Sequence, residues 1–217
     1  MTSMRIFKTL NGLASTMTNA PYMIPWTGYS MADSAYWFNV FSKDEAKAII
    51  DACMADDSLI RQGHVGGTVN TTMRNNKARW VYPHNEDIAD LIFPRIATIA
   101  GKLNARYFRK SFDHLGFYEG VQFAMYRPGE HYAKTHHDRL SDMNNAYAQR
   151  VLSLSVQLSD PDDYDGGELI LNPDGAERVA GKDLGTMTMF PSFIQHRVSP
   201  VTRGTRYALI AWIGGED

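Results

Sequence analysis

The stretch 150–159 shows the clearest pattern in the chain, a strict alternation of hydrophobic and polar residues. The hydrophobic residues are Leu152, Leu154, Val156 and Leu158, and the polar residues between them are Ser153, Ser155 and Gln157. A period of two residues is typical of a β-strand. Small polar side chains opposite apolar ones predict a sheet with one face on the core and the other on a polar cavity or on solvent.

Four more β-prone segments accompany this strand in the second half of the chain, and clusters of Gly, Pro and Asp separate them. They cover residues 121–126, 167–172, 185–190 and 205–213. The first half carries helical patterns instead. Helices followed by strands predict an α+β protein, mainly β, in which an antiparallel sandwich or barrel is backed by N-terminal helices.

The first expected helix lies in the stretch 41–54. Ser42 is its N-cap and Glu45 follows three residues later, a combination that forms a capping box. Apolar residues then recur at helical spacing.

The second expected helix lies in the stretch 84–108. Asn85 can cap it, and Pro94 is expected to kink the helix or split it in two. The apolar stripe of this helix comprises Ile88, Leu91, Ile92, Ile96, Ile99 and Leu103.

The composition fits one globular domain. The chain has 217 residues, of which 44% are hydrophobic and 12% aromatic, so it can bury a full core. With 22 Lys and Arg residues against 24 Asp and Glu residues, the net charge is -2. No global basic field attracts nucleic acid or anionic lipid, and we expect neither a nucleic-acid nor a membrane partner.

Residues 1–35 are polar and poor in acids, and we interpret them as an N-terminal extension of unknown role, with a targeting leader as the alternative. Residues 36–217 are expected to form the single domain. Its helical support is expected in 36–110 and its β core in 112–213. Cys53 is the only cysteine, so no internal disulfide can form, and we expect a reducing, cytoplasmic location.

A histidine followed two positions later by an acid occurs twice, as His84 with Glu86 and as His136 with Asp138. The first pair lies at the expected start of a helix, where Glu86 suits the helix dipole and His84 needs no role. We interpret that pair as a chance occurrence. The second pair follows a predicted strand and a Pro-Gly turn, which makes it a candidate for chemistry.

His136 and Asp138 can reach one metal ion if their segment is extended, because residues two apart then point to the same face. His137 would point the opposite way. His196 lies far downstream, and two histidines with one carboxylate form the facial triad that holds non-haem Fe(II) with open positions. Taken alone, His196 would be read as a packing or surface histidine.

Arg206 lies early in the last predicted strand and shares one strand face with Ala208, Ile210 and Trp212. Burying the charge of an arginine that points from a strand into a cavity costs free energy unless an anion binds to it. Its fork of donors suits a carboxylate. The chain therefore carries a candidate metal site and a candidate anion site.

Three segments then point to a family. They are YRPGEHYAKTHHD (126–138), DYDGGELIL (163–171) and MFPSFIQHRVSPVTRGTRYALIAW (189–212). In this order and at these distances they resemble the Fe(II)/2-oxoglutarate dioxygenases, specifically the prolyl 4-hydroxylase-like branch. The resemblance covers about residues 112 to 213 and implies a double-stranded β-helix, or jelly roll, of antiparallel strands.

The resemblance also implies roles for single residues. His136, Asp138 and His196 match the iron ligands, and no catalytic side chain beyond the metal centre is implied. Arg206 matches the basic residue that pairs with the distal carboxylate of 2-oxoglutarate. Tyr126 matches a tyrosine that often hydrogen-bonds the same carboxylate, with a half-buried strand aromatic as the alternative.

Two further residues, Trp212 and Gln122, are candidates for the substrate pocket, and packing is the alternative role for Trp212. The segment 139–150 follows the iron loop and is either a lid over the substrate or a long connection. The resemblance leaves the oligomeric state open.

The implied activity is hydroxylation of an unactivated C–H bond, most simply of a prolyl residue in a peptide or protein, with release of succinate and CO₂. It requires Fe(II), 2-oxoglutarate and O₂, with ascorbate as a candidate reductant. Two alternatives remain open. One is hydroxylation of a free amino acid or small metabolite on the same iron site, and the other is a non-catalytic jelly-roll protein that binds or senses iron.

Overall fold

The computed structural model describes residues 32–64, 67–83, 86–108, 115–139 and 149–215. Most of the expected N-terminal extension lies outside the described residues. His84, Asn85 and most of the possible lid segment also lie outside them. Among the described residues, no helix is both long and apolar enough to cross a membrane.

The largest sheet has seven strands, and each neighbouring pair is antiparallel. Its order is β1 (Ala35–Trp37), β10 (Met187–Pro191), β6 (Gln149–Gln157), β13 (Arg206–Gly215), β4 (Val121–Tyr126), β3 (Lys77–Val81) and β2 (Arg61–Gln62). The four central strands overlap β-prone segments of the sequence. The first half of the chain, where only helices were expected, supplies β1 at one end of the sheet and β3 and β2 at the other.

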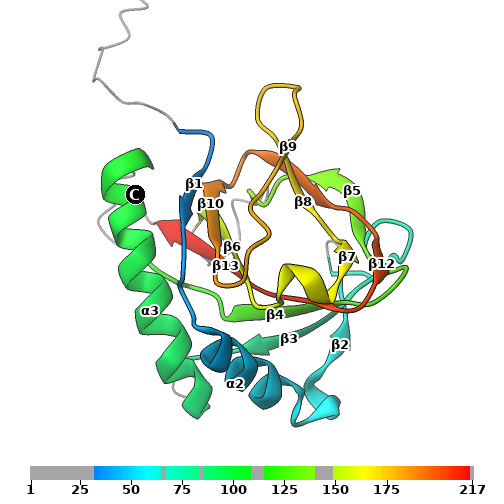
Figure 1. The fold of residues 1–217 in the computed structure, drawn as a ribbon. Coiled ribbons are helices and arrows are strands. Elements are labelled where there is room, and N and C mark those ends of the chain that lie inside the picture. Colours follow the sequence, from blue (N-terminus) through cyan, green and yellow to red (C-terminus); the bar gives the residue numbers. More distant parts are fainter. Residues whose placement is uncertain (1–31, 65–66, 84–85, 109–114, 140–148, 216–217) are drawn as a thin grey trace, which may run out of the picture. The chain divides into compact units, whose positions relative to one another are not determined.

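A second antiparallel sheet has four strands and lies on the side of the large sheet away from α3 (Figure 1). Its order is β5 (Tyr132–His136), β11 (Gln195–Val198), β8 (Leu169–Asn172) and β9 (Arg178–Val179). One apolar cluster joins Ala124 and Tyr126 of the large sheet to Leu169 and Val198 of the small one. The two sheets therefore pack face to face, and the short pair β7 (Asp165–Gly166) and β12 (Val201–Arg203) completes the strands.

Helix α2 (Lys43–Met54) begins with the predicted capping box. The Glu45 backbone N–H donates to Ser42 Oγ at 3.2 Å, and the Ser42 N–H donates to Glu45 Oε2 at 2.8 Å. Two otherwise unpaired donors of the first turn are satisfied in this way. Short 3-10 helices follow at η1 (Asp57–Leu59) and η3 (Pro161–Asp163).

Helix α3 (Asp87–Leu103) runs through Pro94 without interruption and continues into the π-helical turn η2 (Asn104–Phe108). Of the two expected effects of Pro94, a kink or a split, the split does not occur. Ile92 and Ile96 stand on either side of the proline and are both fully buried in the same core. Their packing stabilises the helix on both sides of the proline, although proline removes a backbone hydrogen bond.

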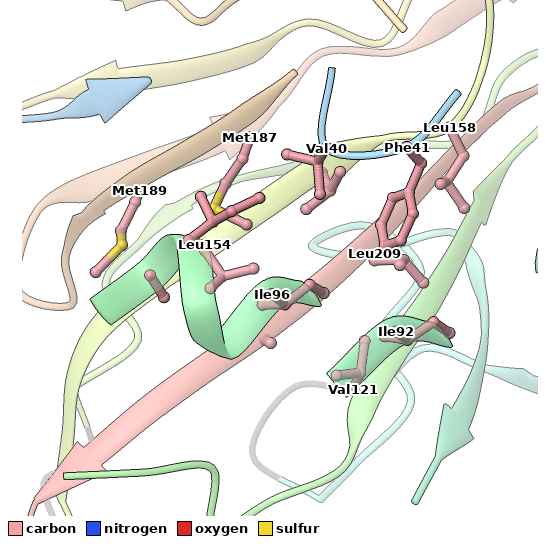
Figure 2. Packing of buried hydrophobic residues seen from close by; sticks show 14 of the residues in the cluster. Val40, Phe41, Ile92, Ile96, Val121, Leu154, Leu158, Met187, Met189 and Leu209 are labelled. Atoms are coloured by element: carbon pink, nitrogen blue, oxygen red, sulfur yellow. The ribbon is translucent and has the colours of Figure 1, made fainter. Parts of the chain in front are cut away.

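The main core lies between the helices and one face of the large sheet. Figure 2 shows Ile92 and Ile96 of α3 beside Leu154 of β6 and Leu209 of β13. The alternation in 150–159 is confirmed, since its leucines and valine belong to this core. The intervening Ser153, Ser155 and Gln157 are also buried. Ser153 and Ser155 line a cavity, and Gln157 accepts a hydrogen bond from Arg206. The fold is mainly β and antiparallel, backed by N-terminal helices, as expected.

Candidate metal centre

His136, Asp138 and His196 come together at one end of the small sheet. His136 ends β5, His196 lies directly opposite it on β11, and Asp138 follows two residues after the end of β5. One ligand atom from each residue lies within 4.8 Å of the others. Asp138 carboxylate oxygens lie 3.4 Å from His196 Nε2 and 3.9 Å from His136 Nε2. The three side chains can therefore coordinate one ion from one side, as the sequence predicted.

Both imidazoles are oriented through their other ring nitrogen. His136 Nδ1 lies 2.9 Å from the Lys134 carbonyl oxygen, and His196 Nδ1 lies 3.0 Å from that of Ile194. A carbonyl oxygen only accepts, so each Nδ1 carries the proton and donates it. Each Nε2 then presents a lone pair to the shared site, as metal-ligating histidines do.

The Asp138 carboxylate is held by a serine pair that the sequence did not single out as functional. Ser153 Oγ donates to Asp138 Oδ2 at 2.8 Å and lies 2.9 Å from Ser192 Oγ. The Asp138 backbone N–H donates to the Ser192 carbonyl oxygen at 2.9 Å. Only the polar alternation of β6 indicated that Ser153 faces a cavity.

Protonation at the site suits a metal cation. Burial, and then the neighbouring His196, lower the pKa of His136 from 6.5 to about 4. Burial by itself raises the pKa of Asp138, but the two adjacent imidazoles and Ser153 outweigh it and hold that pKa below its ordinary value. At neutral pH, His136 is therefore a neutral donor and Asp138 an anion, the forms that bind metal.

Arg206 is the first residue of β13 and is 1% exposed. Its Nε donates to Gln157 Oε1 at 3.1 Å, and neither terminal nitrogen has a hydrogen-bond partner among the described residues. Gly167 leaves room for this side chain, because an added Cβ would lie 3.1 Å from Arg206 Cδ. A buried guanidinium with unpaired donors is costly, so the position is suited to an anion that binds from outside the chain.

Two tyrosines accompany this guanidinium. Tyr126 of β4 lies opposite Arg206 in the strand register, and the Arg206 Cζ is 5.3 Å from its ring centroid. The Tyr164 hydroxyl is buried and has no hydrogen-bond partner among the described residues. Burial raises the pKa of Tyr164, and the nearby Arg206 guanidinium offsets part of that rise. The sequence indicated Tyr126 but not Tyr164, which lies in an acid-rich turn without a recognisable motif.

The metal and anion groups line one cavity of about 590 Å³. All residues predicted for the site lie on its wall, namely His136, Asp138, His196, Arg206, Tyr126, Trp212 and Gln122. His137 also reaches the cavity wall, but it is exposed and lies outside the ligand cluster. The geometry of the cluster is therefore consistent with His136, and not His137, as the ligand.

The substrate-pocket candidates have partners that the sequence did not reveal. The Trp212 ring centroid lies 5.8 Å from that of Trp80, and the Arg150 guanidinium lies 3.8 Å over the Trp212 ring. Gln122 Oε1 accepts from the Arg74 guanidinium at 2.6 Å. These partners come from β3, β6 and a loop, so only the folded chain brings them together.

Known proteins share these features. The family model for the 2OG-Fe(II) oxygenase superfamily matches residues 121–214, which contain every metal ligand and the unpaired arginine. Over this segment the chain is similar to that superfamily. A PKHD-type hydroxylase of Bordetella pertussis is 29% identical over 181 residues, covering 81% of this chain and 75% of the relative. Two Synechococcus PKHD-type hydroxylases are 33% identical over 93 residues, and that match spans only 42% of their length.

Solved structures share the fold of this chain. A Pseudomonas putida prolyl-4-hydroxylase has a TM-score of 0.66 at 21% identity, covering 85% of this chain and 94% of its own. A Trichoplax adhaerens prolyl hydroxylase, in complex with a peptide fragment of hypoxia inducible factor, has a TM-score of 0.67 at 15% identity. It covers 98% of this chain and 92% of its own. The expected jelly-roll fold is thereby confirmed.

The residues of this chain fit the two groups that the name of the matching family model implies. Two imidazole Nε2 atoms and one carboxylate suit Fe(II). The one cysteine, Cys53, is buried in α2 and is not part of this cluster. The unpaired terminal nitrogens of Arg206 suit a dicarboxylate such as 2-oxoglutarate, because an Arg fork binds a carboxylate at two points.

Proposed function

We propose that this chain is an Fe(II)- and 2-oxoglutarate-dependent dioxygenase that hydroxylates a peptidyl proline and releases succinate and CO₂. The observation that carries the proposal is the combination, in one cavity, of a His-Asp-His cluster with a buried arginine whose terminal nitrogens are unpaired. A protein that only bound or sensed iron would need the cluster but not the buried arginine.

The chain's residues have distinct parts in this mechanism. Iron with bound 2-oxoglutarate supplies the oxidising chemistry for an unactivated C–H bond. His136, His196 and Asp138 would hold the ion, with Asp138 fixed by Ser153. Arg206 would bind the distal carboxylate of 2-oxoglutarate, with Tyr126 or Tyr164 as a further donor. The apolar walls at Leu169, Phe190 and Ile210 exclude water from the reacting centre.

Peptidyl proline is the substrate class that the relatives support. The similar curated proteins are PKHD-type hydroxylases, and the similar solved structures include prolyl hydroxylases, one of them with a bound peptide. The wall of the cavity of about 590 Å³ includes the aromatic side chains of Trp212 and Trp80, which give it apolar surface for a pyrrolidine ring. Ascorbate is proposed as the reductant that keeps the iron as Fe(II).

The experiment is an assay of succinate release with Fe(II), 2-oxoglutarate and O₂, with and without ascorbate and a library of proline-rich peptides. We expect peptide-stimulated turnover in the wild type. Failure of the iron-loaded wild type to bind or consume 2-oxoglutarate would overturn the oxygenase proposal. Stimulation by free amino acids or small metabolites alone would overturn the peptidyl-proline part.

Alanine variants of the two neighbouring histidines, His136 and His137, show in the same assay whether activity depends on the metal centre. His136→Ala should lower kcat by at least about 10³-fold, because the ion loses one of three ligands. His137→Ala is the matched control and should keep activity within about threefold, because His137 lies outside the ligand cluster. Equal inactivity of the two variants would contradict this assignment. Arg206→Ala should mainly raise the KM for 2-oxoglutarate.

A further inference from the structure

A second buried arginine lines the cavity, and neither the metal nor 2-oxoglutarate accounts for it. Arg74 is 9% exposed, and its Cζ lies 5.0 Å from the Tyr132 ring centroid. Tyr132 stacks in turn on the metal-site residue His136, with the ring centroids 3.8 Å apart. The Arg74 guanidinium therefore lies near the candidate metal centre.

The Arg74 guanidinium is held rigidly, but only by neutral groups. Its Nε donates to Asn76 Oδ1 at 2.6 Å, and its terminal nitrogens donate to the His64 carbonyl oxygen at 3.2 Å and to Gln122 Oε1 at 2.6 Å. No carboxylate among the described residues lies within ion-pair distance of it. Each terminal nitrogen therefore keeps one N–H that is not committed to these partners.

The backbone is shaped around this arginine. A Cβ added at Gly63 would lie 2.3 Å from Asn76 Oδ1 and 2.5 Å from Arg74 Nε, so only glycine fits there. The Gly63 N–H also donates to the Asn76 carbonyl oxygen at 2.8 Å. The guanidinium is thus placed before any ligand arrives, which lowers the entropy cost of binding one.

The charges of the cavity leave this guanidinium without a counter-ion. Asp138 is the only carboxylate on the described cavity wall, and it belongs to the metal centre. Three further arginines lie on the wall. Glu119 pairs with Arg150 through two hydrogen bonds of 2.6 Å, and Arg61 and Arg139 are exposed to solvent rather than buried. Fe(II), Asp138, Arg206 and a doubly charged 2-oxoglutarate would together be neutral, so Arg74 remains as a buried positive charge. The substrate side of the cavity is therefore cationic, although the chain as a whole has a net charge of -2.

We propose that Arg74 forms a substrate subsite that binds a carboxylate next to the carbon to be hydroxylated. This inference rests on the proposed function and specifies its substrate. Burying a guanidinium without a counter-charge is costly, and a carboxylate is the group that an Arg fork binds best. The carboxylate comes from an acidic side chain beside the target proline or from a free carboxyl group at a chain end. A free amino acid as its source would keep the oxygenase part of the proposed function and overturn the peptidyl-proline part.

The test compares substrates that differ only in one charge. Peptides blocked at both ends carry Glu or Gln next to the proline, a third carries a free carboxyl terminus after the proline, and free proline is the fourth probe. Succinate release gives KM and kcat for each. We expect a KM about tenfold lower for at least one carboxylate-bearing probe than for the blocked Gln peptide. The probe that shows the preference identifies the source of the carboxylate.

Variants assign the preference to Arg74. Arg74→Gln should abolish it, Arg74→Lys should keep part of it, and both should keep the wild-type KM for 2-oxoglutarate. Arg178→Gln is the matched control, because Arg178 is exposed, pairs with Asp33 and Asp174, and is not on the cavity wall. This control should preserve the full preference.

The outcomes separate this inference from the proposed function. Substrate-free consumption of 2-oxoglutarate by the wild type reports the oxygenase centre, and its absence counts against the proposed function. Normal consumption with equal KM values for all probes overturns the carboxylate subsite alone. A proportional rise in KM for the Glu and Gln peptides in Arg74→Gln also overturns it, because Arg74 would then bind a neutral group common to both.

Discussion

Ser153 shows how a single hydroxyl sets the geometry of the metal site. Its Oγ donates to the Asp138 carboxylate at 2.8 Å and is itself held by Ser192. Ser155 lies two residues along the same strand face, and its hydroxyl has no partner among the described residues. The two serines are alike in the sequence pattern and differ only in what they contact.

We therefore predict that Ser153→Ala weakens Mn(II) binding by about tenfold, because a residue that orients a metal ligand typically contributes 10- to 100-fold in affinity. Calorimetry on the full chain measures this without turnover. Ser155→Ala is the matched control and should bind Mn(II) as the wild type does. Equal affinities for the two variants would contradict a positioning role for Ser153.

Cys53 illustrates the opposite case, a reactive group made inert by its surroundings. It is fully buried in α2, and burial raises the pKa of its thiol from 9.0 to about 12. We predict that a thiol reagent at pH 8 labels the native protein at least about 100-fold more slowly than the denatured chain, since the thiolate is the reactive form. Rapid labelling of the native chain would contradict this.

The same raised pKa makes the stability of the fold depend on pH. Because the pKa of Cys53 is higher in the folded chain than in the unfolded chain, Cys53 contributes stability that is complete below about pH 9 and declines as the pH rises towards 12.

At the scale of elements, local signals were sufficient where they were strong. The capping box placed the start of α2 correctly, and alternation placed β6 and its two faces. They failed for β1, β2 and β3, which are short and do not alternate. These strands are stabilised by pairing with the central strands, which is long-range information. Pro94 does not split α3 for a related reason, because tertiary packing on both of its sides outweighs the local penalty.

We predict that Ser42→Ala lowers the free energy of unfolding by about 0.5–2 kcal/mol, because one N–H of the first turn of α2 loses its acceptor. Urea denaturation followed by circular dichroism measures the change. Ser58→Ala is the control, since its side chain does not cap a helix in the described structure and it lies on exposed η1. An equal loss in both variants would show that the cap contributes nothing specific.

At the scale of the whole molecule, the metal centre connects distant parts of the chain. Asp138 and His196 are separated by 58 positions (196 minus 138), yet their ligand atoms lie 3.4 Å apart. The two strands that carry the histidines pair directly, so a bound ion links β5, β11 and the loop after β5. Metal binding should therefore stabilise the native fold as a unit.

We predict that Mn(II) at 100 times its Kd stabilises the protein by about 2.7 kcal/mol. For a chain of this size that raises Tm by roughly 5–10 °C. Differential scanning calorimetry with and without Mn(II) measures the shift, and a chelator should reverse it. His196→Ala should show almost no shift, and a shift as large as that of the wild type would place the ion elsewhere.

The sequence by itself determined the chemistry of the site. The spacing of His136 and Asp138, the later His196 and the strand arginine Arg206 are local patterns, and each needs only the two-residue period of a strand to be interpreted. The same period divided β6 into a core face and a cavity face. Family resemblance then connected these positions, and the folded chain places all of them on one cavity wall.

Only the tertiary structure decided what else faces that cavity. Arg74 lies outside any recognisable motif, and its significance depends on three facts of folding: it is buried, its partners are neutral, and the one nearby arginine–glutamate pair is already satisfied. Ser153 and Tyr164 likewise acquire meaning through contacts across the fold. The physical reason is that hydrogen bonding, burial and uncompensated charge are properties of positions in space, and residues distant in sequence create them.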